Sequence, residues 1–366
     1  MEKIDCQGCG VLIQTSDPDA TGYTPKTSLE KENILCKRCF RLKHYNEIQD
    51  VSYTDDDFLK MVSNIRGENG LVVHVIDIFD VNGTLIKSLP RIVGDKPIIL
   101  VGNKIDLLPK STNKRKLNQW LRASAKEAGI KVKDVFLISS VKGYGIEELT
   151  HQIELIRKKS NVYIVGTTNV GKSTFINRII KQATGYGEVI TTSYFPGTTL
   201  GFIEIPLDDN TSLIDTPGIV NKRQIAHYVS EQDLKVITPN KEIKPRVYQL
   251  NSQQTLFFGG LARFDFIKGE KQSFVCYFSN EIPIHRTKLE NADNLYKTQR
   301  GELLSPPSEK TLEILPEFTQ TTFRITNEKT DIVFPGLGWI TITGENVTIT
   351  AHSPKDVTVS IRRSLI

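Results

Sequence analysis

The sequence of 366 residues predicts an α/β protein built on a doubly wound, mostly parallel sheet, with a cysteine-rich module before it and a β-rich domain after it. Three observations predict this organisation. Buried-strand patterns alternate with helical patterns from about residue 55 to residue 220, as in parallel sheets. Two Cys-x2-Cys pairs precede that region, and short alternating runs punctuated by Gly and Pro follow it. We expect domains over residues 1–50, 51–221 and 222–366.

Composition narrows the class of protein. Hydrophobic residues make up 39% and charged residues 24% of the chain, which is typical of a globular protein and unlike a disordered or fibrous one. The net charge of +5 permits a nucleic-acid partner without requiring one. We find no apolar run long enough for a membrane span and no signal-peptide core, so we expect a cytoplasmic protein with reduced thiols and no membrane partner.

The hydrophobic pattern predicts individual elements. In the central region, strands are expected over residues 71–77, 97–102, 135–138 and 161–165, helices over 114–128, 146–156 and 172–180, and a hairpin over 202–205 and 212–214. In the C-terminal region, strands are expected over residues 254–258, 273–278, 332–334, 339–343, 347–351 and 357–361. Ser305-Pro-Pro-Ser308 is expected to be an exposed connector. Several side chains are expected in the core rather than in a binding site, namely His74, Phe257, Phe258, Phe264, Phe266 and Cys276.

Four of the five cysteines form two Cys-x2-Cys pairs, Cys6 with Cys9 and Cys36 with Cys39. Paired thiolates at this spacing are the usual ligands of tetrahedral structural zinc. The spacer between the pairs is long, so a loop or hairpin must fold back to bring them together. We therefore predict a zinc module with these four cysteines as ligands.

A phosphate-binding loop is the sharpest signal in the chain. The segment 166–173, Gly-Thr-Thr-Asn-Val-Gly-Lys-Ser, has the pattern Gly-x4-Gly-Lys-Ser and lies between a predicted strand and a predicted helix. Its backbone N–H groups can surround phosphate oxygens at a helix N-terminus. Lys172 would reach the β- and γ-phosphates, and Ser173 would bind Mg²⁺. The nucleotide-contacting residues expected here are Gly166, Asn169, Val170, Gly171, Lys172, Ser173 and Thr174.

The Asp-Thr-Pro-Gly segment that ends at Gly218 follows another predicted strand. Its acid, Asp215, can orient Mg²⁺ through water, and the N–H of Gly218 can meet a γ-phosphate. Alone, these four residues are only a turn sequence. Downstream of a phosphate-binding loop, they favour a nucleoside triphosphate as the ligand.

Base recognition is predicted from two further strand ends. In Asn103-Lys104-Ile-Asp106, the Asp106 carboxylate can accept hydrogen bonds from the N1–H and the exocyclic amine of guanine, a donor pair that adenine lacks. Asn103 is expected to join the base loop to the phosphate loop, and the stem of Lys104 to cover the ring. After the next strand come Ser139 and Ser140, where a backbone N–H can donate to the guanine oxygen. Each motif alone could be an ordinary turn, but four together favour a guanine-nucleotide site.

The order of these motifs is unusual. In small GTPases the phosphate loop comes first, whereas here Asn-Lys-x-Asp and Ser-Ser precede it, so the chain resembles circularly permuted GTPases. Such a permutation requires only that the original termini lie close together. With its N-terminal zinc knuckles and β-rich C-terminal region, the chain resembles the YqeH family of circularly permuted, zinc-knuckle-containing ribosome-assembly GTPases. The motif match covers residues 6–218, and beyond 220 it rests on length and general character.

The resemblance implies further roles. Thr199 matches the switch threonine that binds Mg²⁺ and the γ-phosphate, although its neighbour Thr198 is an alternative. Asn169 stands where potassium-dependent GTPases coordinate K⁺, and its alternative role is to stabilise the loop. Ile219 stands where Ras-like enzymes carry a glutamine that orients water, so intrinsic hydrolysis is expected to be slow, ~10⁻⁴ s⁻¹. The expected catalytic residues are Lys172, Thr199, Asp215 and Gly218.

The implied partners are the small ribosomal subunit or its precursor and ribosomal RNA, with no DNA expected. Basic residues occur near the second knuckle (Lys37, Arg38, Arg41, Lys43 and His44) and in three C-terminal groups (Lys241, Lys244 and Arg246; His285, Arg286 and Lys288; Arg362 and Arg363). Basic side chains in these places favour contacts with nucleic-acid phosphates. The alternative for the zinc module is that it only stabilises its own small domain and its charges are solvated. Two other functions stay open, a GTP-sensing module with negligible hydrolysis and a GTPase whose partner is a protein.

Overall fold

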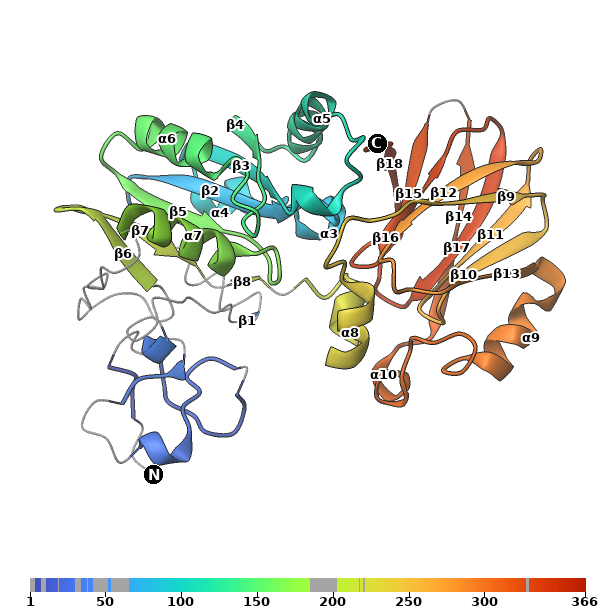
Figure 1. Ribbon diagram of the computed structural model, residues 1–366, viewed down its shortest axis with the longest axis horizontal. Coiled ribbons are helices and arrows are strands. Elements are labelled where there is room, and N and C mark those ends of the chain that lie inside the picture. Colours follow the sequence, from blue (N-terminus) through green and yellow to red (C-terminus); the bar gives the residue numbers. More distant parts are fainter. Residues whose placement is uncertain are drawn as a thin grey trace. The chain divides into compact units, whose positions relative to one another are not determined.

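A computed structural model of the chain describes residues 4–7, 11–18, 20–29, 34–37, 39–41, 52–53, 66–184, 203–216, 218–219, 221–326 and 329–366. Two compact units make up the chain. One contains residues 1–105 and 114–220, and the other contains residues 106–113 and 221–366. Figure 1 labels the helices and strands of both units. Among the described residues, no helix has the length and apolarity that a membrane crossing requires.

A parallel sheet forms the centre of the first unit. Six strands of its described part lie in the order β4-β3-β2-β5-β7-β6. They are β2 (Gly70–Asp77), β3 (Ile98–Asn103), β4 (Val132–Leu137), β5 (Asn161–Val165), β6 (Ile203–Asp208) and β7 (Thr211–Asp215). All are parallel to their neighbours except β6, which pairs antiparallel with β7 as the predicted hairpin. The mixed parallel sheet is the predicted fold class, although β4 begins at Val132 rather than at residue 135.

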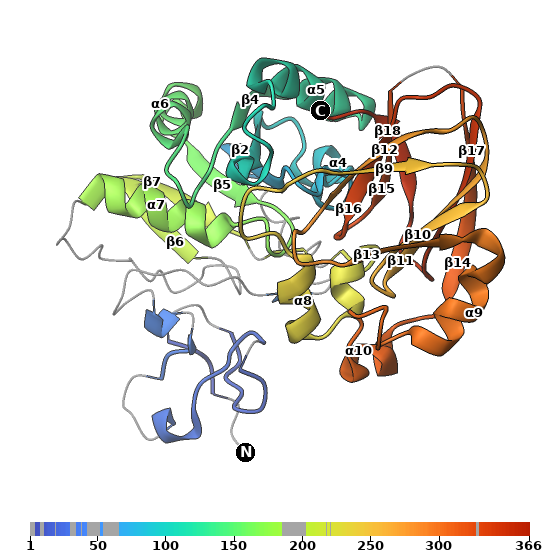
Figure 2. The same cartoon turned by 45° about the vertical axis from the view of Figure 1, so that its right-hand side comes forward.

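Helices cover both faces of this sheet (Figures 1 and 2). The longer helices are α5 (Lys114–Glu127), α6 (Ile146–Arg157) and α7 (Lys172–Thr184), and the shorter ones are α3 (Val81–Thr84), α4 (Leu89–Val93) and η2 (Ile105–Leu107). Apolar side chains of α6 and α7 share one core with Val73 and Val75 of β2. On the opposite face, Leu121 of α5 packs so closely on Gly102 of β3 that a Cβ there would lie 2.9 Å from its Cδ1. Because β2, β3, β4, β5 and β7 are parallel, their carboxyl ends lie at one edge of the sheet, between the two helical layers.

The second unit is a two-sheet β-structure. Its described strands form two five-stranded antiparallel sheets, with the orders β13-β10-β11-β17-β14 and β18-β15-β16-β12-β9. The strands are β9 (Arg246–Leu250), β10 (Gln254–Phe258), β11 (Ala262–Lys268), β12 (Gln272–Phe278), β13 (Ile284–Lys288), β14 (Phe318–Ile325), β15 (Thr330–Phe334), β16 (Gly338–Ile342), β17 (Val347–Pro354) and β18 (Ser360–Arg363). The helices are η3 (Ile225–Tyr228), α8 (Glu231–Ile237), α9 (Leu289–Gln299) and α10 (Glu309–Ile314).

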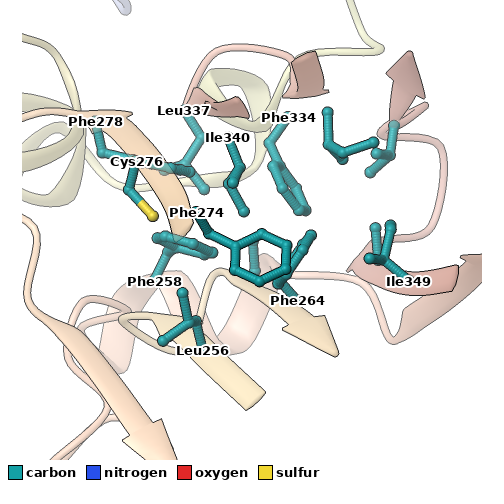
Figure 3. Packing of buried hydrophobic residues seen from close by; sticks show 14 of the residues in the cluster. Leu256, Phe258, Phe264, Phe274, Cys276, Phe278, Phe334, Leu337, Ile340 and Ile349 are labelled. Atoms are coloured by element: carbon teal, nitrogen blue, oxygen red, sulfur yellow. The ribbon is translucent and has the colours of Figure 1, made fainter. Parts of the chain in front are cut away.

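Aliphatic and phenylalanine side chains together fill the core of the second unit (Figure 3). Phe258 stacks on Phe278 with ring centroids 4.0 Å apart, and Phe264 meets Phe274 edge to face at 5.2 Å. Phe257 is also fully buried, but in a smaller cluster with Ala292 of α9. The predicted core residues Phe257, Phe258, Phe264, Phe266 and Cys276 are therefore all buried. Burial raises the pKa of the Cys276 thiol to about 12.

Two predictions about the C-terminal region are wrong. The last strand is β18, so residues 357–359 precede it, with Val357 and Val359 buried instead of paired. The expected exposed connector is also partly buried, because Pro306 accepts a backbone hydrogen bond from Gly260 at 2.7 Å and the Ser308 N–H donates to Asp233 at 2.7 Å. A polar, proline-rich composition predicted exposure, but these tertiary hydrogen bonds hold the segment against the domain.

Candidate nucleotide-binding site

The phosphate-loop lysine is aimed into its own loop. Lys172 is the first residue of α7 and is only 1% exposed. Its Nζ donates to the carbonyl oxygens of Gly166 at 3.3 Å and Thr167 at 3.1 Å. Ser173 follows it and is also buried, whereas Thr174 is exposed. A cation and a hydroxyl therefore lie at a helix N-terminus, the arrangement that suits a phosphate with its Mg²⁺.

Asn103 joins three strand ends. It is buried at the end of β3, and its Nδ2 donates to the Val170 carbonyl oxygen at 2.9 Å. Its Oδ1 accepts from both the N–H and the hydroxyl of Ser140, each at 3.0 Å. Gly171 has φ +87°, and a Cβ there would lie 2.6 Å from Asn103 Nδ2, so only glycine lets the two loops approach this closely.

The residues expected to contact the base follow β3 and β4 in the chain. Asp106 is in η2, directly after β3, and the N–H of Ile105 donates to the Ile138 carbonyl at 3.1 Å. Ser139, buried after β4, accepts a hydrogen bond from the Lys142 N–H through its hydroxyl at 3.0 Å. The backbone of the base loop is thus tied to the end of β4.

Lys104 contacts two loops, and one partner was missed from the sequence. Its Nζ donates to Asp77 Oδ2 and to the Asn169 carbonyl oxygen, both at 2.6 Å. In the sequence, Asp77 only interrupts an apolar run. It is nevertheless the last residue of a buried strand whose neighbour ends at Asn103. A polar residue at that position, on the edge where parallel sheets bind ligands, was the available signal.

The segment after β7 lies along the phosphate loop. Asp215 is buried at the end of β7, and the hydroxyl of Thr216 donates to the Ile164 carbonyl at 2.7 Å. The Ile219 N–H donates to the Gly166 carbonyl oxygen at 3.2 Å, and the Ile219 carbonyl oxygen accepts from the Thr168 N–H at 2.9 Å. Strand β8 (Gly218–Ile219) also pairs in parallel with β1 (Ser52–Tyr53). Thr199, with its alternative Thr198, lies outside the described residues.

The backbone of Gly218 is pressed against the phosphate loop. A Cβ at this position would lie 3.0 Å from the Thr168 side chain and 3.1 Å from Lys172 Nζ. The Gly218 backbone therefore lies close to the lysine ammonium that would meet the terminal phosphates. Ile219 follows with an aliphatic side chain, which cannot hydrogen-bond to water.

His74, in the middle of β2, is a buried and neutral histidine. Its Nδ1 is 3.3 Å from the Val165 carbonyl oxygen and its Nε2 accepts from the Ile86 N–H at 3.2 Å. Burial first, and then the charge of Lys172, lower its pKa to about 4, against a raising contribution from the Val165 hydrogen bond. The histidine is a core residue with both ring nitrogens in use, as expected.

Acidification is expected to weaken β2 through His74. The unfolded chain protonates this imidazole below pH 6.5 and the folded chain only near pH 4, so stability present above pH 6.5 is lost as pH falls toward 4. The full loss is on the order of 3 kcal/mol. Hydrogen exchange of the β2 amides at pH 7, pH 5 and pH 4, corrected for the intrinsic exchange rate at each pH, follows this loss. A His74→Gln variant is expected to flatten the dependence, whereas His151→Gln, at an exposed position of α6, leaves it unchanged.

Three cysteines converge in the N-terminal region. The Sγ atoms of Cys6, Cys36 and Cys39 lie within 4.8 Å of one another, and all three residues are buried. The Cys36 N–H also donates to Cys6 Sγ at 3.2 Å, an interaction typical of thiolate ligands. Cys9 lies outside the described residues. Three soft donors this close fit a zinc ion, which bonds to sulfur at about 2.3 Å.

The predicted basic groups do not all remain available for a partner. Arg246 donates to the carbonyls of Ile282 at 2.6 Å and Ser279 at 3.2 Å, and Arg362 pairs with buried Asp331 at 3.2 Å. The residues of these groups that are exposed are Lys241, Lys244, Arg286, Lys288 and Arg363, with His285 half-buried. Near the second knuckle, Lys37 and Arg41 are half-buried, and Arg38, Lys43 and His44 lie outside the described residues.

The parallel sheet, the phosphate loop and the Asn-Lys-x-Asp loop define a GTP-binding protein of the P-loop class. Residues 161–255 match the family model described as 50S ribosome-binding GTPase. Residues 271–365 match the model YqeH-like, C-terminal. The chain belongs to the YqeH family.

Several curated proteins are similar to the chain. It is 58% identical to the uncharacterized protein YqeH of Bacillus subtilis, over the full length of both. It is 30% identical to the NO-associated protein 1 of Arabidopsis thaliana, over 92% of this chain and 69% of the relative. A GTPase Der from Methylococcus capsulatus is 29% identical over 47% of this chain and 37% of its own.

Proposed function

We propose that this chain hydrolyses GTP to GDP and phosphate and acts as a nucleotide-dependent switch in assembly of the small ribosomal subunit. The observation that carries the nucleotide assignment is Asn103, whose side chain bonds both to the phosphate loop at Val170 and to Ser140, which follows β4. The motif order supports a permuted GTPase domain over residues 51–221. Residues 1–50 and 222–366 are then the zinc module and the domain proposed to contact the ribosome.

The proposed roles follow from position. Lys172 neutralises the β- and γ-phosphates, and the Gly218 N–H meets the γ-phosphate. Oxygen ligands suit Mg²⁺, and its proposed ligands are Ser173, Thr199 and Asp215, with Asp215 acting through water. The proposed nucleotide-contacting residues are Asn103, Lys104, Asp106, Ser139, Ser140, Gly166, Asn169, Val170, Gly171 and Thr174.

Hydrolysis by the isolated protein is proposed to be slow. An aliphatic side chain at position 219 cannot align the attacking water, so the site lacks the group that Ras-like enzymes use. Turnover must then rely on a cation, on another residue or on a partner. The same observation favours the second candidate function, a GTP sensor in which hydrolysis matters little.

Potassium is expected to raise the turnover through Asn169. This residue is exposed on the phosphate loop with φ +62°, so its side chain is available to a cation beside the phosphates. K⁺ supplies positive charge there. We expect turnover on the order of 10⁻⁴ s⁻¹ in Na⁺, a faster rate in K⁺, and no difference in Asn169→Ala. Asn210→Ala, in the β6–β7 turn, is the control. Equal rates of the unaltered protein in the two salts would refute the potassium site.

The ribosomal role is tested by nucleotide-dependent co-sedimentation of the full chain. The matching GTPase model carries 50S in its description, so separated large and small subunits are both needed. We expect binding to small subunits that differs between a non-hydrolysable GTP analogue and GDP and falls steeply with salt, as for phosphate contacts. Binding to large subunits alone would refute the proposed partner, and salt-insensitive binding would favour a protein contact over RNA.

Release of the γ-phosphate would free the segment that contains Gly218, as in other nucleotide switches. That segment leads directly into the C-terminal domain, which begins near residue 222. We therefore propose that GTP and GDP place the C-terminal domain differently. The proposed location is the cytoplasm, where GTP and assembling ribosomes occur together.

A further inference from the structure

Lys104 holds an unusual position at the edge of the sheet. It is a non-glycine residue with φ +67°, in the left-handed region that L-residues rarely adopt. Asn169, whose carbonyl accepts from its ammonium, also has a positive φ, +62°. Such backbone strain persists only where the surrounding contacts determine it, and it concentrates at functional sites.

The contact that fixes Lys104 most strongly comes from Asp77. The ammonium and the Asp77 carboxylate are 2.6 Å apart, and their side chains are 21% and 12% exposed. The second carboxylate oxygen of Asp77 accepts from the Phe79 N–H at 2.9 Å, which fixes the acid in turn. A charge-assisted hydrogen bond in a partly buried position is shorter and stronger than one between neutral groups.

The position of Asp77 in the sheet makes this contact possible. β2 and β3 are parallel neighbours, and Asp77 lies directly opposite Asn103 in their register. The next residue after Asn103 is Lys104, whose side chain reaches back to β2 and across to the phosphate loop. Its head is held from two sides, so its four-carbon stem lies in one defined place.

We propose that Asp77 is a positioning residue for the purine base. Its carboxylate fixes the Lys104 ammonium so that the lysine stem forms a preformed apolar cover for one face of a bound guanine. This inference rests on the proposed function, because the stem covers a base only if the site takes a guanine nucleotide. Asp77 itself does not touch the nucleotide, and it acts through Lys104.

The test is a double-mutant cycle on GDP affinity, measured by calorimetry of the full chain with Mg²⁺. Asp77→Asn is expected to weaken GDP binding about 10-fold, the size of one charge-assisted hydrogen bond. In a Lys104→Met background, which keeps the stem and removes the ammonium, the same change is expected to cost less than about 2-fold. Asp77→Glu keeps the charge and is expected to recover part of the lost affinity.

A base-free ligand separates positioning from a general structural effect. Tripolyphosphate with Mg²⁺ can occupy only the phosphate loop, so Asp77→Asn is expected to leave its affinity unchanged. The matched control is Asp80→Asn, a buried acid that caps α3 through the Gly83 N–H at 3.1 Å, since asparagine caps a helix equally well. It is expected to bind GDP like the unaltered protein.

Additive effects in the cycle, or an equal loss for GDP and tripolyphosphate, would overturn the role of Asp77. An Asp77→Asn protein that unfolds while Asp80→Asn does not would show a structural role and overturn it too. If the unaltered protein bound tripolyphosphate but no GDP, the proposed function would fail, and this inference with it.

Discussion

Replacing Asp106 by asparagine is expected to transfer the base preference of this chain from guanine to xanthine. In the proposed site, the Asp106 carboxylate would accept from two donors of guanine, whereas an amide offers one acceptor and one donor, which would face the guanine amine. Xanthine carries a carbonyl at that position and can accept from the amide. Buried hydrogen bonds of this kind discriminate strongly, so we expect GDP affinity to fall by at least about 100-fold while xanthosine diphosphate affinity rises.

Calorimetric titration with GDP and with xanthosine diphosphate measures this change in base preference. Asp134→Asn is the matched control, since that acid lies on β4 in an ion pair with Arg122 at 2.7 Å and has no expected role in base recognition. GDP affinity in the control should stay within about 2-fold of the unaltered protein. Retention of full GDP affinity by Asp106→Asn would remove the basis for guanine recognition.

Loss of one zinc ligand is expected to unfold the N-terminal module and leave nucleotide binding intact. The described part of this module has a small apolar core, in which Val11, Ile13 and Leu35 pack around Cys6, Cys36 and Cys39. A core of this size cannot stabilise a domain alone, and structural zinc contributes on the order of 10 kcal/mol to such modules. Cys36→Ser should therefore abolish stoichiometric zinc binding.

Zinc analysis after dialysis, together with hydrogen exchange over residues 4–41, checks this expectation. Cys276→Ala removes a cysteine from the core of the second unit and should retain the metal. GDP affinity is expected to change less than about 3-fold in either variant, because the proposed nucleotide contacts come from other residues. A Cys36→Ser protein that kept one zinc per chain and full protection would contradict the zinc assignment.

The fold class was predictable because local patterns carry it. Strand and helix periodicity located the six-stranded sheet to within a few residues, and the glycine-rich loop fell between β5 and α7 as expected. The β-rich character of the C-terminal region was equally visible. The errors arose where burial depends on distant partners, as at Pro306, whose carbonyl meets Gly260, and at β18, whose start depends on pairing with β15.

Most residues of the candidate site could be predicted from sequence motifs, but the contacts between them could be predicted only in part. Asn103 and Lys172 belong to short motifs with a chemical rationale, so the sequence pointed to both. Asp77 belongs to no such motif, and its proposed role depends on the register that sets it opposite Asn103. The same holds for Ile219, whose backbone bonds to the phosphate loop only because β7 lies next to β5.

By itself, the sequence determined the fold class and pointed to the side chains proposed to bind phosphate, guanine and zinc, since motif spacing and hydrophobic periodicity are local properties of the chain. Only the tertiary structure decided which of them meet. Strand order brings residues from distant positions to one edge of a parallel sheet, and hydrogen bonds across that edge, such as those of Asn103 and Lys104, fix the side chains. Contacts of this kind depend on three-dimensional distance, which spacing along the chain does not encode.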